Sequence, residues 1–282
     1  MEDWFGDEAA NAYLAILNFP PHITKYVISR LRKIEGNEKT KKFNFVMDAG
    51  CGNGISLMNY LPYFDKAVGF DASEDQIDRA NERVKSDAVT FLVGREDALP
   101  APDNSVDLLL TVGALHYMKL TTFLGECKRI LKNTGMCAIY YRTLSKLLVH
   151  YPMKNKSQHA DGSQFLLDYR NKLHEYLKEI HHPTAESFNR YQNIYDQITG
   201  FGKERTDDVT VDYDMTLKEL KSYFWCFPTY RKYNKLFDEK SSPTNTMGEN
   251  LKKLVNADDI KDEDLKLRLT VSMFFIFLYK ET

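Results

Sequence analysis

Two aspartates and three glycines are the residues of this chain whose spacing points most directly to chemistry. Asp48 ends a short apolar run, and glycines follow it at alternate positions: Gly50, Gly52 and Gly54. Asp71 ends a second apolar run, about twenty residues past the glycines, which is the spacing at which an acid meets ribose hydroxyls. Glycines let the backbone turn tightly and let a ligand approach closely. We therefore expect a nucleoside site where the two runs end.

The glycine spacing separates two kinds of nucleoside site. A dinucleotide turn reads G-x-G-x-x-G and cradles a pyrophosphate, which Asp48 would repel, whereas an acid in that place pairs well with an ammonium group. The stretch from Asp48 to Gly54 resembles the D-x-G-x-G-x-G turn of class I S-adenosylmethionine-dependent methyltransferases, which holds the methionine part of the cofactor. A plain tight turn, and a helix-capping role for Asp71, remain the alternatives. The resemblance implies that S-adenosylmethionine is the cofactor and that its first contacts are Asp48, Gly50, Cys51, Gly52, Asp71, Ala72 and Gln76.

Two later stretches are similar to small-molecule members of the same family. The segment 91–107 is close to the pattern G-x-A-E-x-L-P followed by D-x-S-x-D, and in that family the loop at its start borders the adenine. Arg95 and Glu96 depart from the residue types usual in that loop, so Asp97 is our choice for a side-chain contact to the adenine amino group, with a solvated loop acid as the alternative. The segment 111–118 resembles the trans-aconitate and cantharidin methyltransferase group. Further cofactor contacts implied by these stretches are Glu96, Asp97, Val112 and Gly113.

His116, in the second of these stretches, is the candidate catalytic residue. A neutral imidazole near the reacting sulfonium could take a proton from a hydroxyl, because its pKa lies near working pH. The alternative is a structural histidine, hydrogen-bonded to the backbone. Candidates for the wall of the substrate site are aromatic side chains and one arginine that could pair with a substrate carboxylate, although core packing is the alternative for each aromatic residue. With His116, these residues are Trp4, Tyr13, Tyr140, Arg142 and Trp225.

Alternating apolar and helical patterns must position these residues. The strands that we expect are 44–48, 66–71, 89–93, 106–112 and 136–142, with helices at 55–61, 73–85 and 122–132 between them. This alternation predicts a parallel sheet with helices on both faces, and right-handed crossovers place the carboxyl ends of its strands along one edge. Together with the resemblance, it predicts an α/β, doubly wound, mostly parallel seven-stranded sheet.

The remaining segments predict helices added to this sheet. We expect a helical lid segment at 1–40, the cofactor-binding core at 41–144, a helical cap insertion at 145–207, and final strands with a second cap insertion at 208–282. Residues 215–230 resemble the L-x-x-L-x-x-Y-L-R-T-W-S-A-Y segment of the trans-aconitate group but lack its arginine, so we expect a more apolar acceptor than a polyacid. Within these segments the periodicity predicts helices at 163–180, 183–198, 216–232 and 250–266, and strands at 209–215 and 267–279.

Composition narrows the class of partner. The 282 residues are 43% hydrophobic and carry a net charge of −2, which argues against a nucleic-acid backbone or an anionic membrane as the main partner. Four widely spaced cysteines form no zinc or disulfide pattern, and we see no signal peptide, so we expect a cytoplasmic protein without a metal. The sequence does not indicate the oligomeric state, for which a monomer is the default. The expected function is methyl transfer from S-adenosylmethionine to a carboxylate or hydroxyl oxygen of a small molecule. A protein or RNA methyltransferase and a non-catalytic cofactor-binding regulator remain the alternatives.

Overall fold

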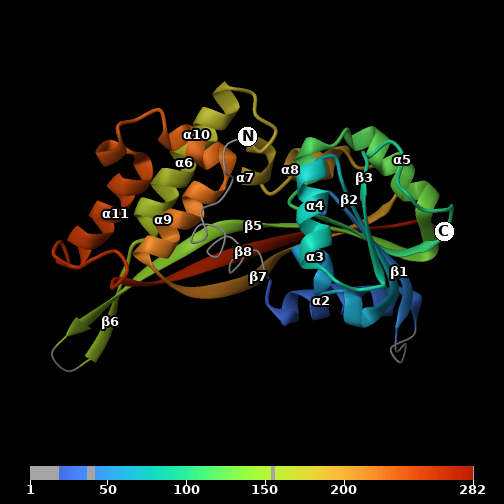
Figure 1. Cartoon of the computed structure of the whole chain (residues 1–282), viewed down its shortest axis with the longest axis horizontal. Helices are drawn as coiled ribbons and strands as arrows, with labels where there is room; N and C mark the ends of the chain where they lie inside the picture. The colour runs from blue at the N-terminus through green and yellow to red at the C-terminus, as the bar shows by residue number, and fades with distance from the viewer. Residues whose placement is uncertain (1–18, 37–41, 154–155, 282) are drawn as a thin grey trace. The chain divides into compact units, whose positions relative to one another are not determined.

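The computed structural model describes residues 19–36, 42–153 and 156–281. Within them, strands form one sheet in the order β3-β2-β1-β4-β5-β8-β7, and β6 pairs with β5 outside this path (Figure 1). The pairs β1–β2, β1–β4, β2–β3 and β4–β5 are parallel, whereas β5–β6 is antiparallel. The strands are β1 (Phe43–Ala49), β2 (Phe64–Asp71), β3 (Val89–Val93), β4 (Val106–Val112), β5 (Leu131–Met153), β6 (Lys156–Asp161), β7 (Gly202–Thr216) and β8 (Lys266–Tyr279).

This strand order confirms the predicted α/β class. The chain leaves β1 in one direction along the sheet, toward β2 and β3, and in the other toward β4 and β5. In open α/β sheets, ligands bind at the point where the order reverses, outside the carboxyl ends of the strands. The strands predicted at 89–93 and 106–112 have these bounds in the structure, and the other three core strands are found with extended ends.

The described residues divide into two compact units, which we describe separately. Among the described residues, the unit with the core sheet comprises those within 19–142, 186–208 and 273–281, and the other comprises those within 143–185 and 209–272. The four-part division at residues 40, 144 and 207 groups the chain differently and stays a prediction. The long strands β5, β7 and β8 contribute residues to both units. No helix in the described ranges combines the length and the apolar character needed to cross a bilayer.

Helices cover both faces of the core sheet. Neighbouring residues of β8 point to opposite faces, and each meets a ring from a different element. Phe275 packs on Tyr26 of α2, with ring centroids 5.1 Å apart, and Phe274 packs edge-on against Tyr191 at 5.2 Å. The helices of this unit are α2 (Pro21–Glu35), α3 (Ile55–Met58), α4 (Glu74–Arg83), α5 (Leu120–Ile130), most of α7 (Ala185–Phe188) and α8 (Gln192–Gln197).

In the part of the chain that the structure describes, the other unit contains four longer helices together with segments of the long strands. Its centre is Tyr169, a buried residue whose hydroxyl accepts a hydrogen bond from Asn234 Nδ2 at 3.0 Å and bonds Thr244 Oγ1 at 3.3 Å. The ring of Tyr169 also packs on Phe224, at a centroid distance of 4.6 Å. Its helices are α6 (Ser163–Glu179), α9 (Leu217–Cys226), α10 (Pro228–Asn234) and α11 (Pro243–Leu254).

Several predicted boundaries were wrong, each for a local reason. The helix predicted at 183–198 is interrupted because Arg190 and Tyr191 both have φ 58°, outside the helical region. The helix predicted at 216–232 breaks before Pro228, which cannot continue a helix because it lacks an N–H. The helix predicted at 250–266 is Pro243–Leu254 instead, and the β5–β6 hairpin was not predicted at all.

Candidate functional site

The glycine turn after β1 is folded tightly against the segment that follows β4. Gly50, Gly52 and Gly54 all have positive φ, at 72°, 53° and 77°, a conformation that side chains disfavour. The turn is anchored by two hydrogen bonds, because the N–H groups of residues 50 and 51 both donate to the Phe70 carbonyl, at 2.9 and 3.0 Å. A Cβ added at Gly50 would lie 2.4 Å from the Cβ of Ala114. The glycine therefore lets the loops after β1 and β4 meet at the switch point, where the strand order reverses.

Asp71 ties this turn to the start of the next helix. Its Oδ2 accepts the Gly52 N–H at 2.9 Å, and its Oδ1 accepts the Ser73 N–H at 3.0 Å. Ser73 is the N-cap of α4, and its hydroxyl accepts the Gln76 N–H. A carboxylate has about four lone-pair positions, so Asp71 keeps room for further donors. Its side chain combines a helix-positioning role with an open, ligand-facing one.

Asp48 lies beneath the turn and is fully buried. Its Oδ2 accepts the Ser56 hydroxyl at 2.8 Å, whereas its Oδ1 has no hydrogen-bond partner among the described residues. Burial is the main effect that raises the pKa of this carboxyl to about 7. The hydrogen bond from Ser56 lowers the pKa, and the charge of Asp71 raises it, but each of these effects is smaller than that of burial. A buried carboxylate oxygen without a partner is costly, so this site favours a cationic or donor group nearby.

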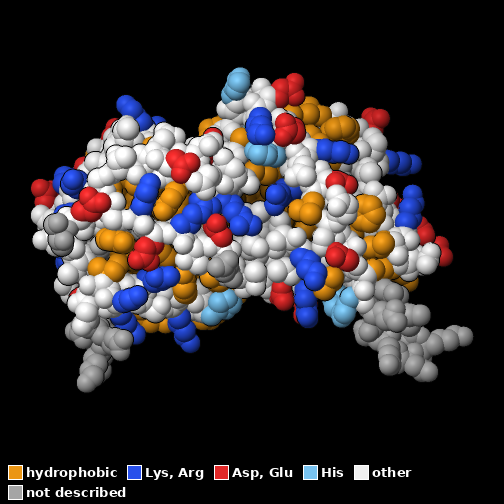
Figure 2. Space-filling model, turned by 180° about the vertical axis from the view of Figure 1, so that it is seen from behind, with side chains coloured by type: hydrophobic (Ala, Val, Ile, Leu, Met, Phe, Trp, Pro, Cys, Tyr) orange, Lys and Arg blue, Asp and Glu red, His pale blue; other side chains and the backbone are white. Residues whose placement is uncertain are grey.

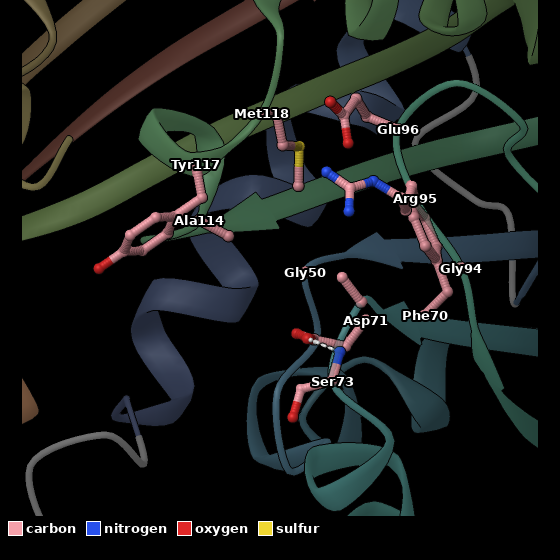
Figure 3. A pocket seen from close by; sticks show the side chains of 11 residues that line it. Gly50, Phe70, Asp71, Ser73, Gly94, Arg95, Glu96, Ala114, Tyr117 and Met118 are labelled. Atoms are coloured by element: carbon pink, nitrogen blue, oxygen red, sulfur yellow. Dashed lines mark hydrogen bonds between the residues drawn. The ribbon is translucent and has the colours of Figure 1, made fainter.

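A cavity of about 380 Å³ lies above these residues, where β1, β2, β3 and β4 end (Figure 3). Its size is within the range of small-molecule sites. Four of the predicted cofactor residues line it: Gly50, Asp71, Ala72 and Glu96. The sequence reasoning did not find the lining residues Phe70, Ser73, Gly94, Arg95, Ala114, Tyr117 and Met118.

The other predicted cofactor residues lie around the cavity and do not line it. Cys51 is buried, and the side-chain oxygen of Gln76 lies beside Gly52. Val112 ends β4, and Gly113 is covered by the ring of Tyr141, since a Cβ there would lie 2.5 Å from that ring. Asp97 is exposed and is absent from the lining, so its contact with adenine stays a prediction.

The loop after β3 is fixed at both ends. Glu96 Oε1 accepts the Lys119 N–H at 3.0 Å, and this hydrogen bond holds the pKa of Glu96 below its ordinary value. Glu96 thus joins the loop after β3 to the start of α5. Farther along, the Arg129 guanidinium donates to both oxygens of Glu126 at 2.7 Å, and Glu126 Oε2 also accepts the Leu99 N–H at 2.8 Å. These bonds hold the cavity wall in place from outside.

His116 is held by a buried tyrosine. Its Nδ1 lies 2.5 Å from the Tyr191 hydroxyl, and Tyr191 is fully buried. The imidazole also lies against the ring of Tyr117, at a centroid distance of 4.1 Å. His116 does not line the cavity, although Ala114 and Tyr117 on either side of it do. This arrangement fixes the ring and leaves Nε2 as the nitrogen not bonded to Tyr191.

The predicted substrate-wall residues are dispersed. Tyr140 is buried in the core, and its hydroxyl lies 3.1 Å from that of Tyr60, which places it away from the cavity surface. Arg142 is also buried, with its guanidinium 5.7 Å from the Phe19 ring centroid. Trp225 lies on α9 in the other compact unit. Trp4 and Tyr13 fall outside the described residues.

Comparison with known proteins identifies methyltransferases as the relatives of this chain. Residues 47–139 match the family model described as a methyltransferase domain. A Dictyostelium discoideum protein assigned as a methyltransferase is 29% identical over 143 residues, which are 51% of this chain and 52% of that protein. A Saccharomyces cerevisiae protein assigned as an S-adenosylmethionine-dependent methyltransferase is 27% identical over 121 residues, 41% of each chain. The chain therefore spans about half of these relatives or less.

The fold is shared more widely than the sequence. The solved structure of a protein assigned as a type II methyltransferase, from Anaeromyxobacter dehalogenans, matches with a TM-score of 0.60 at 15% identity. The match covers 92% of this chain and 96% of that one. At this identity the likeness concerns the fold alone. It agrees with a mostly parallel sheet with flanking helices.

Proposed function

We propose that this chain, whose residues 47–139 form a class I S-adenosylmethionine-dependent methyltransferase domain, transfers a methyl group from S-adenosylmethionine to an oxygen of a small, partly apolar molecule. The observation that carries the proposal is the meeting of the glycine turn and Asp71 at one cavity, at the switch point of the sheet. The cavity fits such a cofactor, because Gly50 and Asp71 line it and because the buried Oδ1 of Asp48, beneath the glycine turn, has no hydrogen-bond partner among the described residues.

The residues around the cavity have distinct roles in this proposal. Asp71 accepts hydroxyl donors from the ribose while its two backbone bonds hold it still. Asp48 and the glycine turn receive the cationic amino-acid end, because an ammonium group offsets the cost of a buried carboxylate. When bound, S-adenosylmethionine supplies a methyl group already activated on a sulfonium. The protein therefore contributes mainly alignment and the exclusion of water.

The acceptor's proton is the remaining chemical requirement. A carboxylate acceptor attacks without a base, whereas a hydroxyl must lose its proton as the new bond forms. A neutral imidazole can take that proton, and the Tyr191 hydroxyl, 2.5 Å from Nδ1, holds the His116 ring in place. We assign this role to His116 for hydroxyl acceptors only. The choice of oxygen as the target rests on the resemblance of residues 111–118 to the trans-aconitate group.

A free small molecule is the acceptor class that we favour. The net charge of −2 offers no overall attraction to a phosphate backbone. Figure 2 shows Lys and Arg side chains interspersed with Asp and Glu over the face that it presents, where a nucleic-acid groove would need one sign of charge.

The test is an acceptor screen with the full chain and methyl-labelled S-adenosylmethionine. Panels of small aliphatic and aromatic carboxylic acids, alcohols and phenols are compared with total RNA and with a protein lysate. We expect labelled methyl esters or ethers from the small-molecule panel, and Asp71→Ala should reduce them while Asp78→Ala, an exposed carboxylate on α4, should not. Label found only in RNA or protein would contradict the proposal.

A further inference from the structure

Arg95 is the one cationic residue among those that line the cavity, and its charge helps to hold the pKa of Glu96 below its ordinary value. It is exposed, it follows Gly94 at the end of β3, and Figure 3 shows its guanidinium extending from that loop into the space near Glu96 and Met118. No hydrogen bond or ion pair to Arg95 is found within the described parts of the chain. Its neighbour Glu96 already accepts the Lys119 N–H at 3.0 Å. The guanidinium is therefore available to a ligand.

The order of the strands locates the part of the cofactor that meets Arg95. β1, β2 and β3 are adjacent in the sheet, with strands about 4.8 Å apart. With the amino-acid end at the turn after β1 and the ribose on Asp71 after β2, the purine extends toward the end of β3. There it meets Gly94, whose N–H donates to the Asp71 carbonyl at 2.9 Å, and the residue that follows Gly94.

We propose that Arg95 covers the purine of the cofactor, with its guanidinium plane stacked on the face of the base. This inference rests on the proposed function, and it adds a residue that selects for an aromatic base at this end of the cavity. A guanidinium is planar, weakly hydrated and stacks on aromatic faces, which a lysine ammonium cannot do. Stacking of this kind tolerates any purine, so Arg95 recognises the ring and leaves its edge to backbone groups.

The competing partner for Arg95 is the carboxylate at the amino-acid end of the cofactor. A guanidinium binds carboxylates strongly by paired hydrogen bonds. In the sheet, however, β2 separates the end of β3 from the end of β1, where the amino-acid end is placed. Two cofactor fragments distinguish the partners, because 5′-methylthioadenosine keeps the adenine and ribose of S-adenosylhomocysteine and lacks its amino and carboxyl groups.

The test is calorimetric titration of both ligands into the full chain and three variants. Arg95→Ala removes the guanidinium, Arg95→Lys keeps the charge without the plane, and Arg83→Ala is a control at an exposed arginine of α4. Thermal melts establish that each variant is folded. We expect Arg95→Ala to weaken both ligands by a similar factor, roughly tenfold, with Arg95→Lys recovering little of it. Arg83→Ala should bind as the wild type does.

Three results would overturn the assignment of Arg95. Loss of affinity for S-adenosylhomocysteine alone would assign the guanidinium to the carboxylate, and full recovery in Arg95→Lys would reduce it to a point charge. Unchanged affinities in Arg95→Ala, with the wild type binding both ligands, would likewise contradict only this inference. Failure of the wild type to bind either ligand would instead contradict the proposed function itself.

Discussion

Replacing Asp48 with asparagine should remove a pH dependence from cofactor binding. Asp48 is fully buried, and burial is the main reason that its pKa is raised to about 7. Asparagine has nearly the same shape, can still bond the Ser56 hydroxyl, and is neutral at every pH. The variant therefore separates the charge of the residue from its packing.

The size of the effect follows from the pKa. With the pKa at about 7, Asp48 is about one-tenth ionised at pH 6 and about nine-tenths ionised at pH 8. If the ammonium end of the cofactor requires the ionised form, its dissociation constant should fall about tenfold between about pH 6 and about pH 8, which is about 1.4 kcal/mol. Below pH 6 the affinity should keep falling by up to about tenfold per pH unit.

The raised pKa of Asp48 also makes the free energy of unfolding depend on pH. Because the folded pKa lies above the ordinary value for aspartate, the native state binds more protons than the unfolded state between about pH 4 and about pH 7. The contribution of Asp48 to the free energy of unfolding is therefore present at low pH and is lost as pH rises through about 7. Relative to Asp48→Asn, the unliganded wild type should lose stability across this window.

The assay is calorimetric titration with S-adenosylhomocysteine across this pH range, with urea unfolding of the unliganded proteins. Asp78→Asn, at an exposed carboxylate of α4, should keep the pH dependence of the wild type. Asp48→Asn should bind more weakly at pH 8 and show a flat profile. An equally steep profile in Asp48→Asn would refute the reasoning, because another group would then carry the proton.

Three further predictions follow from the geometry of the site. Asp71→Ala should weaken S-adenosylhomocysteine binding by about 1–3 kcal/mol through lost charge-assisted bonds to ribose, and unchanged calorimetric affinity would remove Asp71 from the site. Gly50→Ala should lower the free energy of unfolding by at least about 2 kcal/mol, because φ is 72° and the new Cβ would lie 2.4 Å from that of Ala114; a denaturant midpoint equal to that of the wild type would contradict this. Glu126→Gln should lower the free energy of unfolding by about 1–2 kcal/mol at neutral pH. Because Arg129 lowers the pKa of Glu126, the difference in stability between wild type and variant should vanish as acid protonates the wild-type carboxyl. A difference that persists in acid would show that charge is not the cause.

The central strands of the core sheet could be predicted because they are buried on both faces. Every residue of β4 from Val106 to Thr111 is buried, so the strand appears in the sequence as a mostly apolar run, with Asp107 and Thr111 as its polar members. The same reasoning placed Gly50 and Asp71 at one edge. Lining residues such as Phe70 and Gly94 occupy that edge too, and aligning the strand ends with one another would have found them.

The break at Tyr191 could not be predicted, because its cause lies far away in the sequence. Residues 183–198 have helical periodicity, yet Arg190 and Tyr191 adopt left-handed conformations that neither residue type favours. The Tyr191 side chain bonds His116 and packs on Phe274, so tertiary contacts override local preference. The direction of the Arg95 side chain depends in the same way on loops that sequence periodicity does not describe.

The central claim is that one cavity holds S-adenosylmethionine across the ends of β1, β2 and β3. A crystal structure of the full chain grown with S-adenosylhomocysteine tests it most directly. We predict density in the cavity with the ribose hydroxyls on Asp71, the amino group toward Asp48 and the purine beside Gly94. A cavity that stays empty at saturating ligand, or that binds a nicotinamide or a nucleoside triphosphate instead, would contradict the claim.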